Sequence, residues 1–244
     1  KGLKGGHSGA EIHLGLGNAS KLLARFLADN ADTLGLRLLD FTGGTLRNAI
    51  PREAIVTLAV AADKADALKA AAQEFLATIQ FELSAVEKKI AFVVEAAESN
   101  AKALTAETQG KFLALLNATP NGVIRMSDDV KGVVETSLNI GVVTMEADHA
   151  EINCLIRSLI DTGRDYVVQM LTSLGQLAGA QTKAKGGYPG WQPDADSAIM
   201  ALTRQTYIAL FDKTPNIQVI HAGLECGLFK KPYPDMDMVS IGPT

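Results

Sequence analysis

The sequence has 244 residues, of which 47% are hydrophobic and only 5% aromatic, so a core built from Ala, Leu, Val and Ile is expected. Its net charge of −4 is small and its Lys and Arg residues form no stripe, so nucleic acid is not an expected partner. No apolar run approaches the roughly 18 residues of a membrane span, and a membrane is not an expected partner either. Two cysteines in separate segments indicate a reducing compartment, which favours a cytoplasmic location.

The first part of the chain predicts strands around one helix. Residues 1–9 predict a strand that leads into a turn at His7. Strands are also expected over residues 36–41 and 54–61, joined by a glycine-containing connection. A helix is expected over residues 18–30, because its apolar side chains share one face: Leu22, Leu23, Phe26 and Leu27.

A long helix is predicted over residues 65–97. Its apolar positions step by three or four, and at 1.5 Å per residue it would span about 50 Å. A helix of that length needs a broad surface, so we expect it to pack on a wide sheet; pairing with a partner helix is the alternative. The stripe consists of Leu68, Ala72, Phe75, Ile79, Leu83, Val86, Ile90 and Val93.

A hairpin is the next strong pattern, with strands expected over residues 133–145 and 151–159. A helix over 102–116 precedes it, and a helix over 164–177 and a short strand over 179–184 follow it. In the second hairpin strand apolar and polar residues alternate, which places Arg157 on the face opposite Ile152, Cys154 and Ile156.

A domain boundary is predicted in the Gly- and Pro-rich stretch 185–190, which cannot continue a strand or helix. Beyond it the pattern is α/β: a helix over 195–211 capped by Asp194, a strand over 217–220, a short helix near Gly227 and a strand over 238–241. The predicted fold is α+β. Residues 1–185 are expected to form a mainly antiparallel sheet with helices on one face, in ferredoxin-like halves, and residues 186–244 part of an α/β domain.

The residues alone predict no metal site. The sequence has no His-Glu-x-x-His or Cys-x-x-Cys pair, and Asp235 and Asp237 near a proline turn favour a solvated loop. A nucleophile pair of Cys226 with His221 is disfavoured by the five-residue spacing, and a buried thiol is the expected state of Cys226.

Three polar residues are candidates for ligand binding. His7 follows Gly5-Gly6, where the backbone leaves room for a ligand, although most such histidines are structural. Arg157 presents a fork of donors that suits a carboxylate; a surface ion pair with Glu151 or Asp161 is the alternative. Asn48 is a loop residue whose side chain could instead bond its own backbone.

Several motifs resemble one known family. They are Lys4-Gly5-Gly6-His7-Ser8-Gly9, Gly43-Gly44-Thr45-Leu46-Arg47-Asn48-Ala49-Ile50-Pro51, Leu155-Ile156-Arg157-Ser158, Tyr188-Pro189-Gly190-Trp191, His221-Ala222-Gly223-Leu224-Glu225-Cys226-Gly227 and Val239-Ser240-Ile241-Gly242-Pro243. Together they are similar to the zinc dipeptidase family that includes carnosinase, carboxypeptidase G, peptidase T and the aminoacylases. The similarity runs the whole length, and it implies that residues 1–185 are a lid domain and residues 186–244 a piece of the catalytic domain.

The resemblance implies roles for these residues. His7 would hydrogen-bond the substrate carbonyl and steady the oxyanion, and Asn48 and Arg157 would anchor the substrate end. His221, Gly223 and Glu225 would line the cleft, with Glu225 facing the substrate's amino group or an imidazolium. The two zinc ions and the general-base Glu of the family would be held outside this chain, so no residue here is expected to bind metal.

The implied activity is hydrolysis of unblocked dipeptides, Xaa-His (carnosine-like) included, by a metal-activated water. The chain is expected to be an inactive fragment by itself, from a protein that dimerises through its lid. Two alternatives stay open: a non-catalytic lid or small-molecule-binding α+β module, and a related tripeptidase or aminoacylase.

Overall fold

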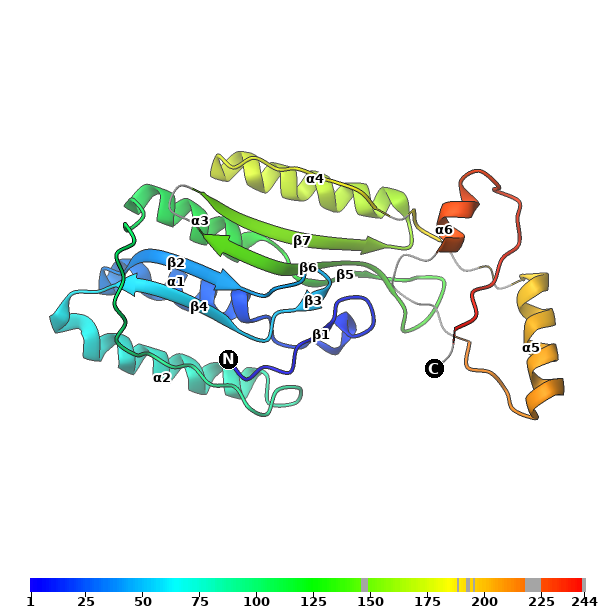
Figure 1. Ribbon diagram of the computed structural model, residues 1–244, viewed down its shortest axis with the longest axis horizontal. Coiled ribbons are helices and arrows are strands. Elements are labelled where there is room, and N and C mark those ends of the chain that lie inside the picture. The colour runs from blue at the N-terminus through cyan, green and yellow to red at the C-terminus, as the bar shows by residue number, and fades with distance from the viewer. Residues whose placement is uncertain (146–148, 188, 192–193, 195, 218–224, 243–244) are drawn as a thin grey trace.

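A five-stranded antiparallel sheet organises the chain, in the order β4-β2-β6-β5 with β7 also paired to β6 (Figure 1). Its strands are β2 (Arg37–Gly43), β4 (Ala54–Ala59), β5 (Gly122–Met126), β6 (Val134–Met145) and β7 (Ala150–Ser158). A separate short pair joins β1 (Gly6–His7) to β3 (Ala49–Ile50). The structure is a computed structural model that describes residues 1–145, 149–187, 189–191, 194, 196–217 and 225–242.

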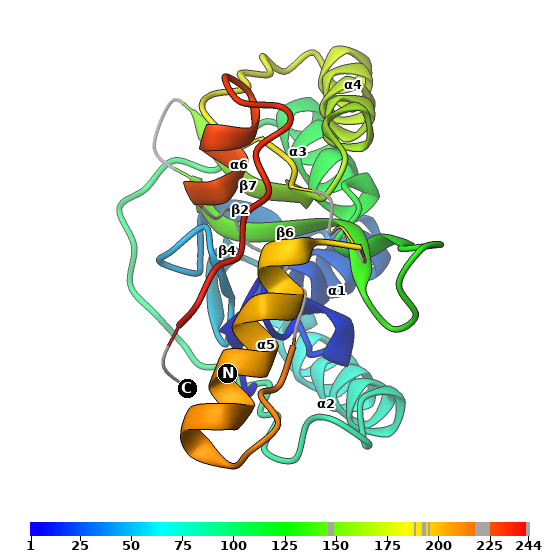
Figure 2. The ribbon, with the colours of Figure 1, turned by 90° about the vertical axis from the view of Figure 1, so that its right-hand side faces the viewer.

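Four helices cover one face of this sheet, as Figure 2 shows for α1 to α4. The helices are α1 (Ala19–Leu34), α2 (Ala65–Glu82), α3 (Ala106–Ala118), α4 (Asp161–Ala178), α5 (Ala198–Phe211) and α6 (Glu225–Lys230), with short 3-10 turns η1 (Ile12–Leu14) and η2 (Ala62–Lys64). The predicted α+β class, with an antiparallel sheet and helices on one face, is confirmed. The helices expected over 18–30, 102–116 and 164–177 are also present, and the two strands of the expected hairpin pair antiparallel; the turn expected at Ala147-Asp148 lies outside the described residues.

The core lies between the sheet and helices α1, α2 and α3. Phe26 of α1, Phe75 of α2 and Phe92 form a trio of rings with centroids 4.9–5.4 Å apart. Phe41 of β2 meets Phe112 of α3 edge to face at 5.7 Å. Each fully buried side chain of this size contributes roughly 1.5–3 kcal/mol, so these rings anchor the three helices on the sheet.

The sheet is split along one edge of β6. On that edge β5 pairs as far as Leu138 and β2 begins only at Val143, so no strand pairs with the residues between them. Side-chain amides fill this gap: the backbone N–H of Ile140 donates to Asn121 Oδ1 at 2.8 Å, and Asn18 Nδ2 donates to the Ile140 carbonyl at 2.9 Å. Backbone groups buried here therefore keep hydrogen-bond partners without a neighbouring strand.

A loop crosses the sheet at this split. Gly141 faces the backbone of Arg47 so closely that a Cβ there would collide with it, and a Cβ on Gly44 would collide with the Gly141 carbonyl. Gly44 also has φ of +70°, which side-chain-bearing residues rarely adopt. These two glycines therefore let residues 44–50 lie directly on the face of β6 that is turned away from the helices.

The prediction of one long helix over residues 65–97 is wrong for its second half. Helix α2 ends at Glu82, and the chain then runs back along it (Figure 1). The reversal is fixed by Glu87, which is 4% exposed and whose carboxylate accepts from the backbone N–H groups of Lys4 (2.8 Å) and Gly17 (3.0 Å). The helical period of residues 83–97 thus yields to long-range contacts that no local pattern shows.

Other differences lie at element ends. Residues 1–9 contribute only the two-residue β1, and β5 was not predicted. The strands expected over 179–184 and 238–241 are absent from the described residues, since no strand lies beside either segment to pair with it. The strand expected over 217–220 lies outside the described residues except for its first position.

Helix α5 begins three residues later than predicted. Its cap is Ser197, whose Oγ accepts from the Met200 N–H at 3.1 Å, and not Asp194. The Asp237 carboxylate adds to this end by accepting from Ser197 Oγ (2.6 Å) and the Ile199 N–H (2.8 Å), which lowers the pKa of that carboxyl. Asp237 therefore supports the Ser197 cap at the start of α5.

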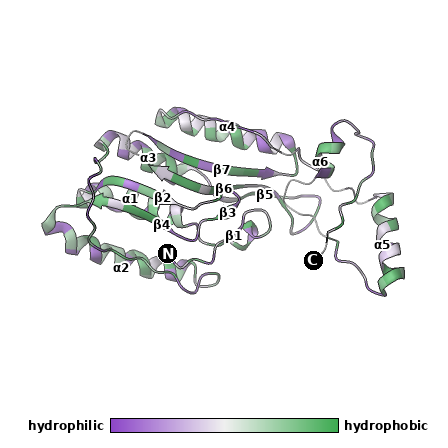
Figure 3. Cartoon of the chain, in the orientation of Figure 1, coloured by the Kyte–Doolittle hydropathy of each residue, from purple (hydrophilic) through white to green (hydrophobic). Residues whose placement is uncertain are grey.

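Helix α5 is largely hydrophobic in Figure 3, yet none of its described residues is buried. No helix among the described residues is long and apolar enough to cross a membrane.

We expect Asn18→Ala to lower the free energy of unfolding by about 2–4 kcal/mol. The change removes the cap of α1, where Asn18 Oδ1 accepts from the Ser20 and Lys21 N–H groups, and also leaves the buried Ile140 carbonyl unpaired. Thr105→Ala, which removes only the exposed cap of α3, should cost about 1 kcal/mol. Urea unfolding of the intact protein measures the free energy of unfolding of both variants. An equal decrease in the two variants would contradict the role of Asn18 as hydrogen-bond partner of the unpaired β6 backbone.

Candidate substrate-binding site

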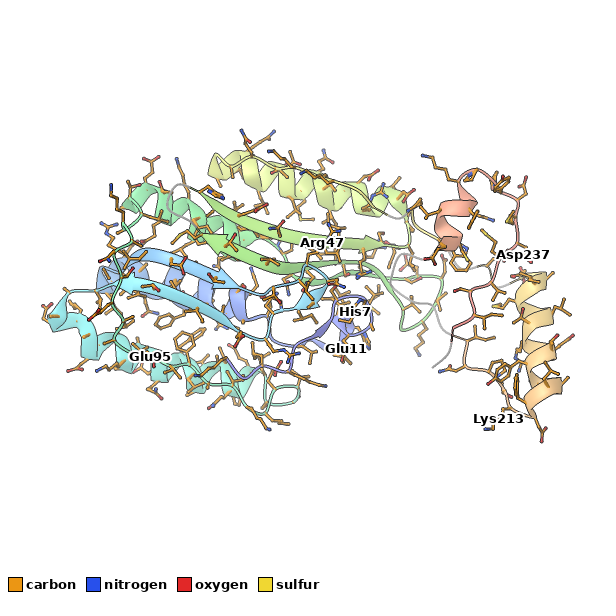
Figure 4. All side chains as sticks on the ribbon, viewed as in Figure 1. His7, Glu11, Arg47, Glu95, Lys213 and Asp237 are labelled. Atoms are coloured by element: carbon orange, nitrogen blue, oxygen red, sulfur yellow. The ribbon has the colours of Figure 1, made fainter. Side chains whose placement is uncertain are left out.

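The pairing of β1 with β3 places two of the predicted residues side by side. His7 lies opposite Ala49, and the Ser8 N–H donates to the Asn48 carbonyl at 2.9 Å. Both His7 and Asn48 have exposed side chains. Figure 4 shows His7 with Glu11 beside it, and Arg47 on the neighbouring loop. The glycine-rich motif around His7 and the loop around Asn48 thus form one surface.

The turn after His7 fixes how its imidazole is used. Backbone N–H groups of Gly9 and Ala10 both point at His7 Nδ1, each at 3.2 Å. An N–H group can only donate, so Nδ1 is the acceptor nitrogen, and the proton of the neutral ring lies on Nε2. His7 therefore presents one N–H donor outward from an exposed position.

Glu11 holds the backbone of the same turn. Its carboxylate accepts from the His7 N–H at 2.8 Å, and its own N–H donates to the His7 carbonyl at 2.9 Å. These two hydrogen bonds close a turn that begins at His7, directly after Gly5-Gly6. This turn, and not packing of the imidazole, orients His7.

Arg157 reaches the same surface from β7. It lies on the face opposite Cys154 and Ile152, which pack against the core, as the strand alternation predicted. Its Nε donates to the Ser8 hydroxyl at 3.3 Å, and burial of half of the guanidinium lowers its pKa. The alternative ion pairs are not formed with either candidate: Asp161 bonds Arg164, and no described carboxylate pairs with Arg157.

Asn139 supports this surface, and the sequence analysis did not single it out. Its side chain is 1% exposed, and Nδ2 donates to the carbonyls of Arg47 (2.9 Å) and Ala49 (2.8 Å), on either side of Asn48. The signal was an Asn two residues before a Gly within an otherwise apolar strand, Leu138 to Val143. Such polar interruptions of a buried strand mark a place where another backbone approaches closely.

The assembled surface is rich in donors. His7, the backbone of Asn48 and the Arg157 guanidinium are linked through Ser8 and the β1–β3 pair, whereas the nearby Glu11 carboxylate is turned to the backbone. Such an arrangement suits a ligand that carries carbonyl and carboxylate oxygens.

The remaining predicted residues lie elsewhere in the chain. Glu225 is the exposed first residue of α6, and His221 and Gly223 fall outside the described residues. Nothing in the described part therefore joins these three to His7, and their role stays a prediction.

The described residues contain no group of three or more His, Cys, Asp or Glu side chains that could hold a metal ion. Burial raises the pKa of the Cys154 thiol to about 12, so this side chain stays protonated at neutral pH and is no thiolate nucleophile.

A separate groove of about 490 Å³ lies at the start of α4, on the helix side of the sheet. Its charged groups are already paired, since Arg125 bonds both Glu135 (3.1 Å) and Asp128. None of the predicted site residues lines it, so the surface around His7 remains the candidate site.

Comparison with known proteins identifies relatives of the whole chain. Residues 1–87 match the family model described as the peptidase dimerisation domain. The chain is 67% identical over all 244 residues to the cytosol non-specific dipeptidase of Escherichia coli (strain K12), of which it covers 50%. It matches the crystal structure of aminoacylhistidine dipeptidase from Vibrio alginolyticus with a TM-score of 0.93 and 56% identity, over 100% of this chain and 50% of that one.

The chain therefore spans about half the length of these relatives. The resemblance to dipeptidases that its motifs predict is confirmed over the whole chain.

Proposed function

We propose that this chain is the substrate-covering part of a metal-dependent dipeptidase that hydrolyses unblocked dipeptides, Xaa-His included. One observation carries the proposal: in a chain 67% identical to a cytosol non-specific dipeptidase, the β1–β3 pair and Ser8 bring His7, Asn48 and Arg157 to one surface. The three side chains come from segments far apart in the sequence, and a dipeptide offers the oxygens that they can bind.

His7 would act on the scissile carbonyl. Its Nε2–H is free to donate, and a fixed donor aimed at an oxygen that gains negative charge stabilises the transition state more than the ground state. Because Nδ1 is engaged by two amides, the neutral ring need not rearrange before it donates.

Arg157 would bind the C-terminal carboxylate of the substrate, with Asn48 beside it. Its terminal nitrogens form a fork that matches a carboxylate, and partial burial strengthens such a pair. Specific retention of a free carboxylate would restrict the reaction to unblocked C-termini. His221, Gly223 and Glu225 would line the cleft, with Glu225 facing a cationic group of the substrate.

Metal chemistry would come, on the family resemblance, from residues outside this chain. We propose two zinc ions there, on the family resemblance; when bound, they would activate the attacking water.

Residues 1–185 would form the lid and residues 186–244 a piece of the catalytic domain. The match of residues 1–87 to a dimerisation domain supports a homodimer formed through the lid. The exposed apolar side chains of α5, including Leu202, Leu210 and Phe211, support a second domain that continues beyond the lid. A cytosolic location follows the name of the Escherichia coli relative.

The competing function is a lid that only assembles subunits. The dimerisation-domain match favours this function. The effect of His7→Ala on turnover and on assembly distinguishes it from the catalytic function.

We expect His7→Ala in the intact protein to lower kcat on Xaa-His dipeptides about 10²- to 10³-fold, because the donor at the developing oxyanion is lost. Steady-state kinetics measures the loss, and sedimentation should show unchanged assembly. His13→Ala, which removes another exposed histidine six residues away, is the matched control and should leave kcat unchanged. Unchanged turnover in His7→Ala with lost assembly would establish the purely structural lid.

Arg157→Ala should raise KM for dipeptides about 10- to 100-fold, because the carboxylate loses charge-assisted hydrogen bonds. The preference for a dipeptide over its C-terminal amide should shrink by the same factor. Arg25→Ala is the control, since Arg25 pairs with Glu82 on the surface of α1 and α2. A preserved preference for the free carboxylate would exclude Arg157 from its recognition.

A further inference from the structure

Ser8 is linked to all three candidate residues, His7, Asn48 and Arg157. It is 1% exposed and follows His7 directly; its N–H donates to the Asn48 carbonyl at 2.9 Å, and its hydroxyl accepts from Arg157 Nε at 3.3 Å. The backbone bond needs no particular side chain, whereas the bond to Arg157 needs an oxygen at this position. The hydroxyl therefore has a role that the fold of the turn does not require.

The bond to Nε decides which part of the guanidinium remains for a ligand. A carboxylate can approach an arginine either along the Nε side or end-on at the two terminal nitrogens. With Nε engaged by Ser8, the two terminal nitrogens are the pair left to bind end-on. A long, half-buried side chain that is already held also loses less conformational freedom when the ligand arrives.

We propose that Ser8 is a positioning residue that orients Arg157 for end-on binding of the substrate's C-terminal carboxylate. This inference rests on the proposed function, because it takes the carboxylate of a dipeptide as the ligand of Arg157. Ser8 itself touches no substrate; it acts through Arg157. Its backbone is fixed beside His7 and is bonded to the Asn48 carbonyl.

The test is Ser8→Ala in the intact protein, with two readouts. KM for a dipeptide should rise about tenfold with kcat nearly unchanged, and the preference over the dipeptide amide should shrink by the same factor. In protein labelled with ¹⁵N-arginine, the Nε–H of Arg157, assigned with Arg157→Lys, should exchange with water at least about tenfold faster. Ser8→Thr, which keeps the oxygen, should restore both values.

Ser20→Ala is the matched control, since Ser20 is also buried but no described group bonds its hydroxyl. It should change neither readout.

The outcomes separate this inference from the proposed function. Unchanged exchange of Nε–H in Ser8→Ala overturns the positioning role, and so does an equal rise of KM for dipeptide and amide. Faster exchange with an unchanged KM shows that Ser8 bonds Arg157 but is not needed for carboxylate binding, and it overturns the positioning role; the proposed function is tested separately by Arg157→Ala. If Ser8→Ala does not fold, Ser8→Thr decides: slow exchange with native KM supports the role, and fast exchange overturns it.

Discussion

The close approach of residues 44–50 to β6 at Gly141 is the constraint on which the rest of the site depends. β6 has strands on both edges except at this split, where Asn18 and Asn121 bond its backbone and leave its outer face open to the crossing loop. Asn139 then holds the loop by two carbonyls, and the loop provides β3, to which β1 adds. His7 is thus placed by a chain of backbone contacts that begins at a glycine with no room for a side chain.

The two faces of the sheet serve different purposes. The face under α1 to α4 carries the aromatic and aliphatic core, and burial there supplies most of the stability. The opposite face carries Asn139, Gly141 and Arg157, whose polar groups bond backbone and Ser8. A site built on the back of a well-packed sheet inherits its rigidity, so fixed donors remain aligned without help from a ligand.

Sequence patterns predicted what depends on local periodicity. The alternation in β7 placed Arg157 on the face away from the core, α1 followed its apolar stripe, and α3 and α4 lie where helices were predicted. The patterns failed where contacts with distant backbone determine the structure. Residues 83–97 have a helical period, but Glu87 bonds the N–H groups of Lys4 and Gly17, and the chain reverses direction. Likewise no local pattern predicts the partner of Ser8, and the polar interruption of β6 at Asn139 does not show which backbone it binds. Their partners lie 149 and about 90 residues away.

The positions that matter most for the site are therefore not those that would touch a ligand. A side chain on Gly141 would push Arg47, and with it β3, off the sheet; because β1 pairs only with β3, His7 would move as well. Arg157 would stay, since β7 holds it by nine register pairs to β6. Displacement of the loop would thus separate the carbonyl donor from the carboxylate anchor while the core stayed intact, and geometry between these two groups is what a dipeptide of fixed length requires.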